Sequence, residues 1–161
     1  MIDLSRGLRH LAWADDQFFA AIAAMPSQAL EARVAPGEWT VGRLAMHIVD
    51  GAQWCRYCLT GQPLMKLRVP EGSGDVEALR AAIAAINADL LEQVGEPDVS
   101  VVFEDEHGPG SALRSTILTQ ACMHPVEHRA QIACALAVAG LPSVSLDDLD
   151  LWAFESYEAG Q

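Results

Sequence analysis

Apolar residues recur every three or four positions along four long segments of the chain, which is the period of an α-helix with one buried face. The segments cover about residues 3 to 24, 40 to 59, 75 to 94 and 115 to 139. Thr40 is a good N-cap for the second, and Gly140 is placed to stop the fourth. The pattern therefore predicts four amphipathic helices.

The stretches between these helices are rich in proline and glycine, which favour turns. Before the last helix, the β-rich run 99–103 followed by glycines at 108 and 110 predicts a short strand or hairpin. Asp75 is a candidate N-cap for the third helix. The tail after Pro142 is acidic, yet it carries apolar residues that predict packing against the body: Leu149, Leu151, Trp152 and Phe154.

A chain of 161 residues has the size of one domain with a substantial core. We find no internal repeat or linker and expect a single domain over residues 1–161. Four long helices with modest connections predict an all-α four-helix bundle, with a short hairpin before the last helix.

Charge limits the classes of partner. The chain has 22 acidic and 10 basic residues and a net charge of −12. This balance argues against binding nucleic acid phosphates or an anionic membrane surface. No run approaches the ~18 apolar residues of a membrane span, and the first residues lack a secretory leader pattern. We therefore expect a cytoplasmic protein that acts on a small molecule.

Two histidines interrupt the apolar stripe of the fourth helix. His124 and His128 are four residues apart, so both imidazoles project from the same face. Burying two imidazoles costs free energy unless both find partners, and a divalent metal ion would satisfy one nitrogen of each. Core histidines satisfied by hydrogen bonds are the alternative.

His47 lies beside apolar residues in the middle of the second helix and is available as a third ligand. Side chains of facing helices converge in a bundle core, where metal sites are commonly built. Three neutral nitrogens would leave coordination positions open, as in catalytic metal sites. The sequence therefore predicts a metal site at His47, His124 and His128.

Two segments carry a family resemblance. The run 124–132 is a His-x-x-x-His-Arg-small-Gln pattern that resembles the last helix of DinB/YfiT-like proteins. The run 38–48, with its Trp-Thr pair before a helix that contains His47, is similar to the family's other signature. Residues 11–15 are similar to its first helix, so the motifs follow one another in the family's order.

The resemblance implies an up-down-down-up four-helix bundle with one divalent metal ion held by three histidines, which fall on His47, His124 and His128. It also implies thiol-dependent S-transferase or isomerase chemistry, a low-molecular-weight thiol as a second reactant, and a homodimer. We expect zinc or nickel, with iron or manganese as alternatives, because imidazole suits several of these metals. A metal-dependent hydrolase and a non-catalytic metal-binding or small-molecule-binding module are the alternative functions.

The segment 124–128 also reads His-x-x-Glu-His, the motif of inverted zinc proteases. In that interpretation Glu127 is a candidate general base, but the motif needs an acidic third ligand further along the chain, where Glu155 and Glu158 are the late glutamates. Arg129 is a second candidate catalytic residue. It could bind a carboxylate of a substrate or thiol, or pair with an acidic residue of the chain.

Three further features have two interpretations each. Pro125 follows a candidate ligand inside the predicted helix, where we expect a kink that alters the aim of His124. Asp15 lies on the stripe of the first helix and either orients a ligand imidazole or faces water. Cys55 and Cys58 form a Cys-x-x-Cys spacing, but their position deep in a helix favours buried thiols over a redox pair.

Overall fold

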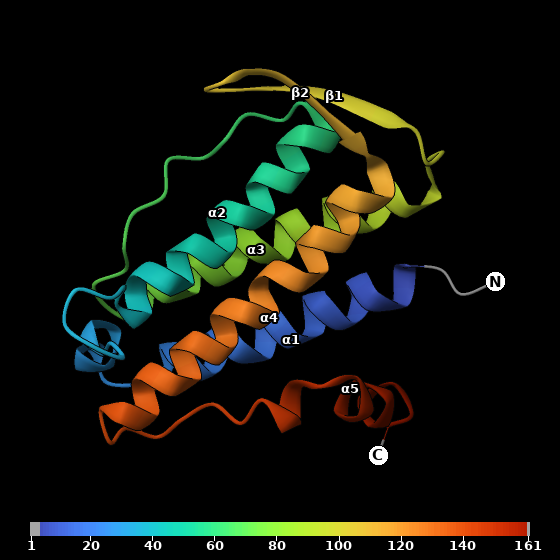
Figure 1. Ribbon diagram of the computed structural model, residues 1–161. Coiled ribbons are helices and arrows are strands. Elements are labelled where there is room, and N and C mark those ends of the chain that lie inside the picture. The colour runs from blue at the N-terminus through green and yellow to red at the C-terminus, as the bar shows by residue number, and fades with distance from the viewer. Residues whose placement is uncertain (1–3, 161) are drawn as a thin grey trace.

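Four long helices make up most of the protein, whose computed structural model describes residues 4–160. They are α1 (Ser5–Ala23), α2 (Val41–Thr60), α3 (Ser73–Glu92) and α4 (Arg114–Val138). α1 packs against α3, and α2 packs against both α4 and α3. α2 and α3 run in the same direction, whereas α1 and α4 run in the opposite one (Figure 1).

Shorter elements complete the chain. Single 3₁₀ turns lie at Ser27–Glu31, Gln93–Gly95 and Asp147–Leu149, and a fifth helix, α5, spans Leu151–Glu158. Strands β1 (Ser100–Asp105) and β2 (Gly108–Leu113) form an antiparallel two-stranded sheet. The fold is therefore mostly helical with one small sheet. None of the helices in the described range is both long and apolar enough to cross a membrane.

The core lies between the four long helices and is built from their apolar stripes. Each helix contributes large side chains that are almost completely buried: Phe18, Phe19 and Ile22 from α1, Val41 and Ile48 from α2, Ile83, Ile86 and Leu90 from α3, and Ile132 and Leu136 from α4. These positions follow the three-and-four spacing of the sequence, so the predicted helices are confirmed to within about two residues at most ends.

The caps of α2 follow the prediction, but the start of α3 does not. The Thr40 hydroxyl accepts a hydrogen bond from the Arg43 N–H at 3.2 Å, and α2 ends at Gly61, whose φ of 72° suits glycine. The prediction of Asp75 as N-cap is wrong, because α3 begins at Ser73. The Asp75 carboxylate instead accepts the Glu71 N–H at 2.9 Å, which tightens the turn that leads into the helix.

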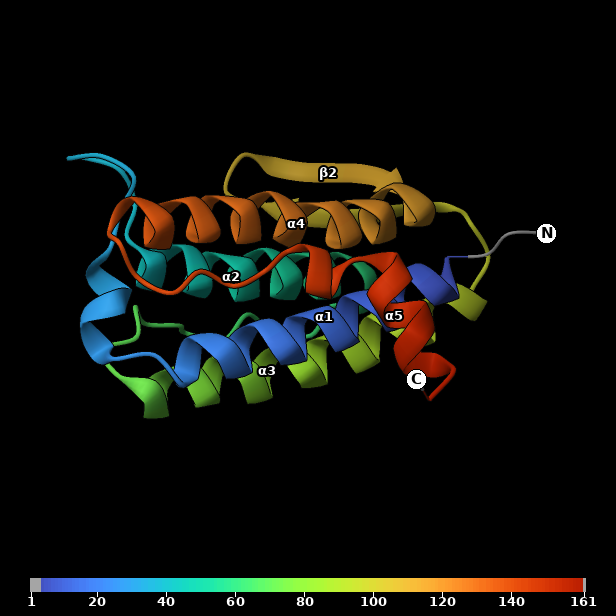
Figure 2. The same ribbon diagram turned by 90° about the horizontal axis from the view of Figure 1, so that it is seen from below.

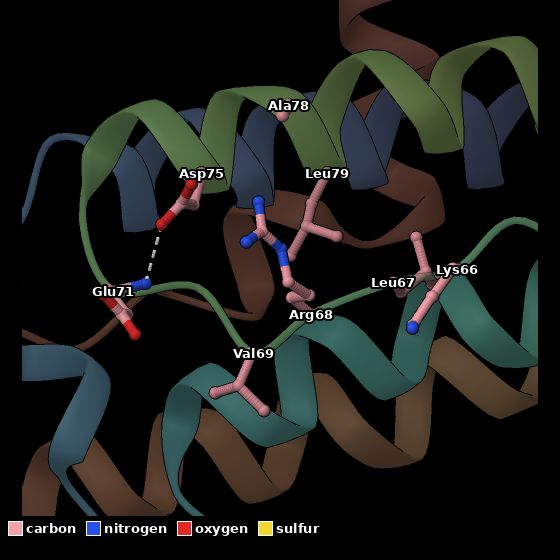
Figure 3. Close-up of a pocket in the computed structure, with 8 residues that line it drawn as sticks. All are labelled: Lys66, Leu67, Arg68, Val69, Glu71, Asp75, Ala78 and Leu79. Atoms are coloured by element: carbon pink, nitrogen blue, oxygen red, sulfur yellow. Dashed lines mark hydrogen bonds between the residues drawn. The ribbon is translucent and has the colours of Figure 1, made fainter.

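The connection between α2 and α3 runs back along the molecule, because two parallel helices need a long return segment (Figure 1). Gln53, 1 % exposed, holds this segment: its amide oxygen accepts the Met65 N–H at 2.7 Å and its amide nitrogen donates to the Met65 carbonyl at 3.2 Å. A cavity of about 330 Å³ separates the segment from α3, with Arg68 extending across towards α3 (Figure 3).

The hairpin and the tail both pack on the helices. The Phe103 ring of β1 lies edge-on to the Trp54 ring of α2, with their centroids 5.9 Å apart. The tail runs beside α1 (Figure 2), where His10 bonds the Leu149 carbonyl at 2.7 Å and Phe154 is buried. The expected packing of the tail is therefore confirmed for its Leu149 and Phe154. It is wrong for Leu151 and Trp152, which are exposed.

Candidate metal centre

Three histidines from two helices meet between α2 and α4. His124 and His128 lie one turn apart on α4, and His47 reaches them from α2, the helix packed alongside. The Nε2 atom of His124 lies 3.3 Å from Nε2 of His47 and 3.1 Å from Nε2 of His128. All three side chains are partly buried, and their ligand atoms lie within 4.8 Å of one another. Such a cluster could hold a metal ion.

Pro125 does not prevent this arrangement. It is buried within α4, which continues as one helix from Arg114 to Val138. Proline cannot donate a backbone N–H, yet the histidines on either side of it in the motif both reach the cluster. The aim of His124 is thus compatible with that of His128 and His47.

Gln131 orients His128 one turn further along α4. Its amide oxygen lies 2.7 Å from Nδ1 of His128. An amide oxygen accepts hydrogen bonds, so Nδ1 donates and Nε2 keeps its lone pair directed into the cluster. This is the tautomer that metal ligation through Nε2 requires.

The surroundings favour the uncharged form of two of the imidazoles, those of His47 and His124. Burial, followed by the neighbouring His128 and His47, lowers the pKa of His124 to about 4. Burial is also the largest cause of the lowered pKa of His47, with His128 next. Metal ligation needs neutral imidazoles, so at neutral pH these groups are in the protonation state that an ion requires.

Two cavities reach the cluster from different sides. The larger, of about 580 Å³, has both polar and apolar walls: Val34, Ala35, Glu38, Trp39, Leu44, His47, His128 and Gln131. The smaller, of about 350 Å³, has mainly apolar walls: His47, Asp50, Gly51, Trp54, Cys55, Leu64, Gln120 and His124. His47 lines both cavities, His128 lines the larger one and His124 lines the smaller one, so both cavities border the cluster.

Asp15 takes neither of the two roles expected for it. Its carboxylate is 1 % exposed, accepts the Asn87 amide N–H of α3 at 2.9 Å and lies 3.6 Å from Arg129 of α4. Burial raises the pKa of Asp15 to about 6, although Arg129 and Asn87 both act to lower it. Arg129 is likewise buried. Its partner is therefore an acidic residue of the chain, Asp15, which was one of the two expected alternatives.

Glu127 is exposed, although it lies next to His128 in the chain. No carboxylate joins the three histidines within residues 4–160. The late acids Glu155 and Glu158 pair with Arg6 on α1 instead. The set of ligands that an inverted zinc protease needs is therefore not assembled in the described structure.

Comparisons with known proteins identify the family of this chain and support its fold. The sequence matches the DinB family over residues 1–158. This chain belongs to the DinB family. The structure is also similar to that of a DinB-like protein from Bacillus cereus, with a TM-score of 0.64 and 22% sequence identity over 85% of this chain and 91% of that one. That likeness shows the DinB-like fold. No curated protein gives a significant sequence match.

The Cys-x-x-Cys pair of this DinB protein is buried, as the sequence indicated. Burial raises the pKa of Cys55 to about 12 and that of Cys58 to about 11. Thiols with raised pKa values are poor nucleophiles at neutral pH. The pair therefore packs as core side chains.

Three further residues of the DinB site contact the histidines in ways that the sequence analysis did not predict. Gln131 belongs to the histidine motif, and its position three residues after His128, on the same helical face, is the sequence signal for this contact. Trp39 is 40% exposed at the larger cavity and lies edge-on to His47, with a centroid distance of 4.9 Å. Gly51 touches the His124 ring, and a glycine inside a helix gave no signal of that contact.

Proposed function

We propose that this DinB protein is a metal-dependent enzyme in which His47, His124 and His128 hold one divalent ion. The observation that carries the proposal is the convergence of the three Nε2 atoms at a place reached by two cavities. The chemistry of the donor set fits, since three imidazoles suit zinc or nickel, with iron or manganese as alternatives. Three protein ligands leave coordination positions for a reactant.

The reaction we propose is thiol-dependent S-transfer or isomerisation on a small molecule. A bound divalent ion lowers the pKa of a coordinated thiol or water and so supplies a nucleophile near neutral pH. The two cavities support a reaction with two reactants, one a low-molecular-weight thiol. Residues of this chain do the positioning: His47 lies between the cavities, and Gln131 keeps His128 in the ligating tautomer.

The two candidate catalytic residues are given different roles. Glu127 is exposed beside His128 and stays the candidate proton acceptor, chiefly for the hydrolase alternative. Arg129 is 4 % exposed and paired with Asp15, which supports a structural role in holding α4 against α1. We further propose a single domain over residues 1–161, an up-down-down-up four-helix bundle that acts as a cytoplasmic homodimer.

Metal analysis of the purified protein tests the site. We expect about one divalent ion per chain, and a loss of affinity greater than the ~10–100-fold typical of outer-shell changes in each of His47→Ala, His124→Ala and His128→Ala. His107→Ala is the matched control, because His107 lies on the exposed turn of the hairpin and should leave binding unchanged. A parent protein without affinity for divalent metals would refute the proposal.

A screen of low-molecular-weight thiols with electrophilic acceptors separates the candidate activities. Turnover that requires the thiol and is lost in His124→Ala supports the transferase. Turnover of hydrolysable substrates without a thiol, reduced in Glu127→Gln, supports the hydrolase. Thermal stabilisation by a small molecule without any turnover supports a binding module.

A further inference from the structure

Gly51 lies inside α2 directly against the His124 ring. A Cβ atom built on Gly51 would be 2.6 Å from Nδ1 and 2.9 Å from Nε2 of His124, and closer still to Cε1. Real Cβ atoms essentially never approach other heavy atoms within 3.0 Å. Any side chain at position 51 would therefore require the His124 ring, or the helix, to move.

The backbone at Gly51 does not itself need glycine. The residue lies in the regular part of α2, and its φ is not among the positive values that favour glycine. Inside a helix, glycine is less favourable than alanine. Space for the neighbouring ring is the feature of this position that alanine could not provide.

The His124 ring has little freedom to give way. Its centroid lies 4.9 Å from that of His47 and 4.5 Å from that of His128, so those rings limit movement along the cluster. The face towards α2 is occupied by Gly51. A methyl group there would push Nε2 away from its position 3.3 Å from Nε2 of His47.

We propose that Gly51 is a positioning residue of the metal centre. Its missing side chain lets the His124 ring stand against α2, where its Nε2 converges with those of the other two histidines. This inference rests on the proposed metal-binding function, and it adds α2 as a direct constraint on the ligand that α4 supplies.

Gly51→Ala tests the inference, with Gly7→Ala as the matched control. Gly7 lies in α1, and its Cβ would meet nothing closer than 3.9 Å. Titration with Co²⁺, followed by its visible absorption, reports both affinity and ligand geometry. We expect Gly51→Ala to lower Co²⁺ affinity by about 10–100-fold and to alter the spectrum, as changes beside metal ligands do. Gly7→Ala should match the parent. Unchanged affinity and spectrum in Gly51→Ala would overturn the inference.

A stability cycle on the metal-free protein separates this inference from the proposed function. Alanine at position 51 should lower or leave unchanged the melting temperature when His124 is present. In a His124→Ala background the space is free, and the same change should raise the melting temperature by about 2–4 °C, as better helix propensity allows. An equal effect in both backgrounds would contradict the contact even if the metal site exists. If Gly51→Ala changes the melting temperature differently in the two backgrounds but the parent protein binds no metal, the contact is supported and the metal-binding function is rejected.

Discussion

His128 and Arg129 are neighbours on α4 but belong to two different buried clusters. His128 faces α2, where three imidazoles of the same kind bring their Nε2 atoms together. Arg129 faces α1, where it meets Asp15, a carboxylate that also accepts a hydrogen bond from Asn87 of α3. One helix thus carries a candidate binding site and a polar core contact on adjacent residues.

The difference lies in whether the groups complement one another. In the Asp15–Asn87–Arg129 cluster, an ion pair of opposite charges and one hydrogen bond offset part of the cost of burial. The three imidazoles carry no opposite charges, and within each close pair of Nε2 atoms only one can donate a hydrogen bond to the other. They are also only partly buried and open to two cavities. Three imidazoles that converge at an accessible place indicate a binding site for an ion from outside the chain.

The largest effect should come from breaking the complementary cluster. Replacing Arg129 by methionine leaves the Asp15 carboxylate buried and without its cation, and we expect the free energy of unfolding to fall by about 3–5 kcal/mol. Urea denaturation of the metal-free protein measures this change. The double variant Asp15→Leu/Arg129→Met should recover much of the loss, because no uncompensated charge stays buried. A stable Arg129→Met protein that has lost only activity would instead favour a catalytic Arg129.

An intermediate effect should come from the hydrogen bond that orients His128. Gln131→Leu removes the acceptor for the Nδ1 proton, and we expect metal affinity to fall by about 10–100-fold with little change in stability. Competition with a chelator of known affinity measures it. Gln131→Glu keeps an acceptor and should retain binding. Gln120→Leu, on the same helix beside the smaller cavity, is the control, and an equal loss there would show that the effect is not specific to the hydrogen bond.

The last effect should appear in the pH dependence of stability, and we expect it to be the smallest because solvent screens the charge of the partly exposed His124 ring. The pKa of His124 is about 4 in the folded chain against an ordinary value of 6.5. Between these values the unfolded chain binds the additional proton, so this histidine makes stability fall as the pH falls from 6.5 towards 4. In the metal-free protein, His124→Ala should therefore lose less stability than the parent over this range.

Urea denaturation at several pH values measures that slope. Asp15, whose pKa of about 6 lies above its ordinary value, contributes in the opposite direction, but it does so in both proteins. Its contribution cancels in the comparison. His107→Ala should keep the slope of the parent, because His107 is exposed. A His124→Ala slope equal to that of the parent would show that burial does not disfavour the charged ring.

The helices could be predicted because each follows from local information. An apolar stripe with a three-and-four spacing, bounded by prolines, glycines and caps such as Thr40, determines where a helix lies and which face it buries. Asp75 shows the limit of that reasoning. Its side chain suits an N-cap, but the extended segment before α3 places Gly72 in that role, and the carboxylate serves the turn. The choice between two nearby caps depends on the path of the whole connection.

For the polar residues on apolar stripes, too, part of the outcome could be predicted from the sequence and part depended on packing. Helical periodicity sets the direction of each side chain, so the sequence alone was enough to predict that His124 and His128 share a face and that Asp15 and His47 lie on buried stripes. It could not determine which stripes meet. The packing of α2 beside α4 brings His47 to the other two histidines and sets Gly51 against the His124 ring. The packing of α1 against α3 and α4 likewise sets Asp15 against Asn87 and Arg129, and the structure shows no hydrogen bond from its carboxylate to a histidine of the cluster within residues 4–160. The physical reason is that helical periodicity shows which face of a helix is buried, whereas the face that packs against it depends on how all the helices pack together.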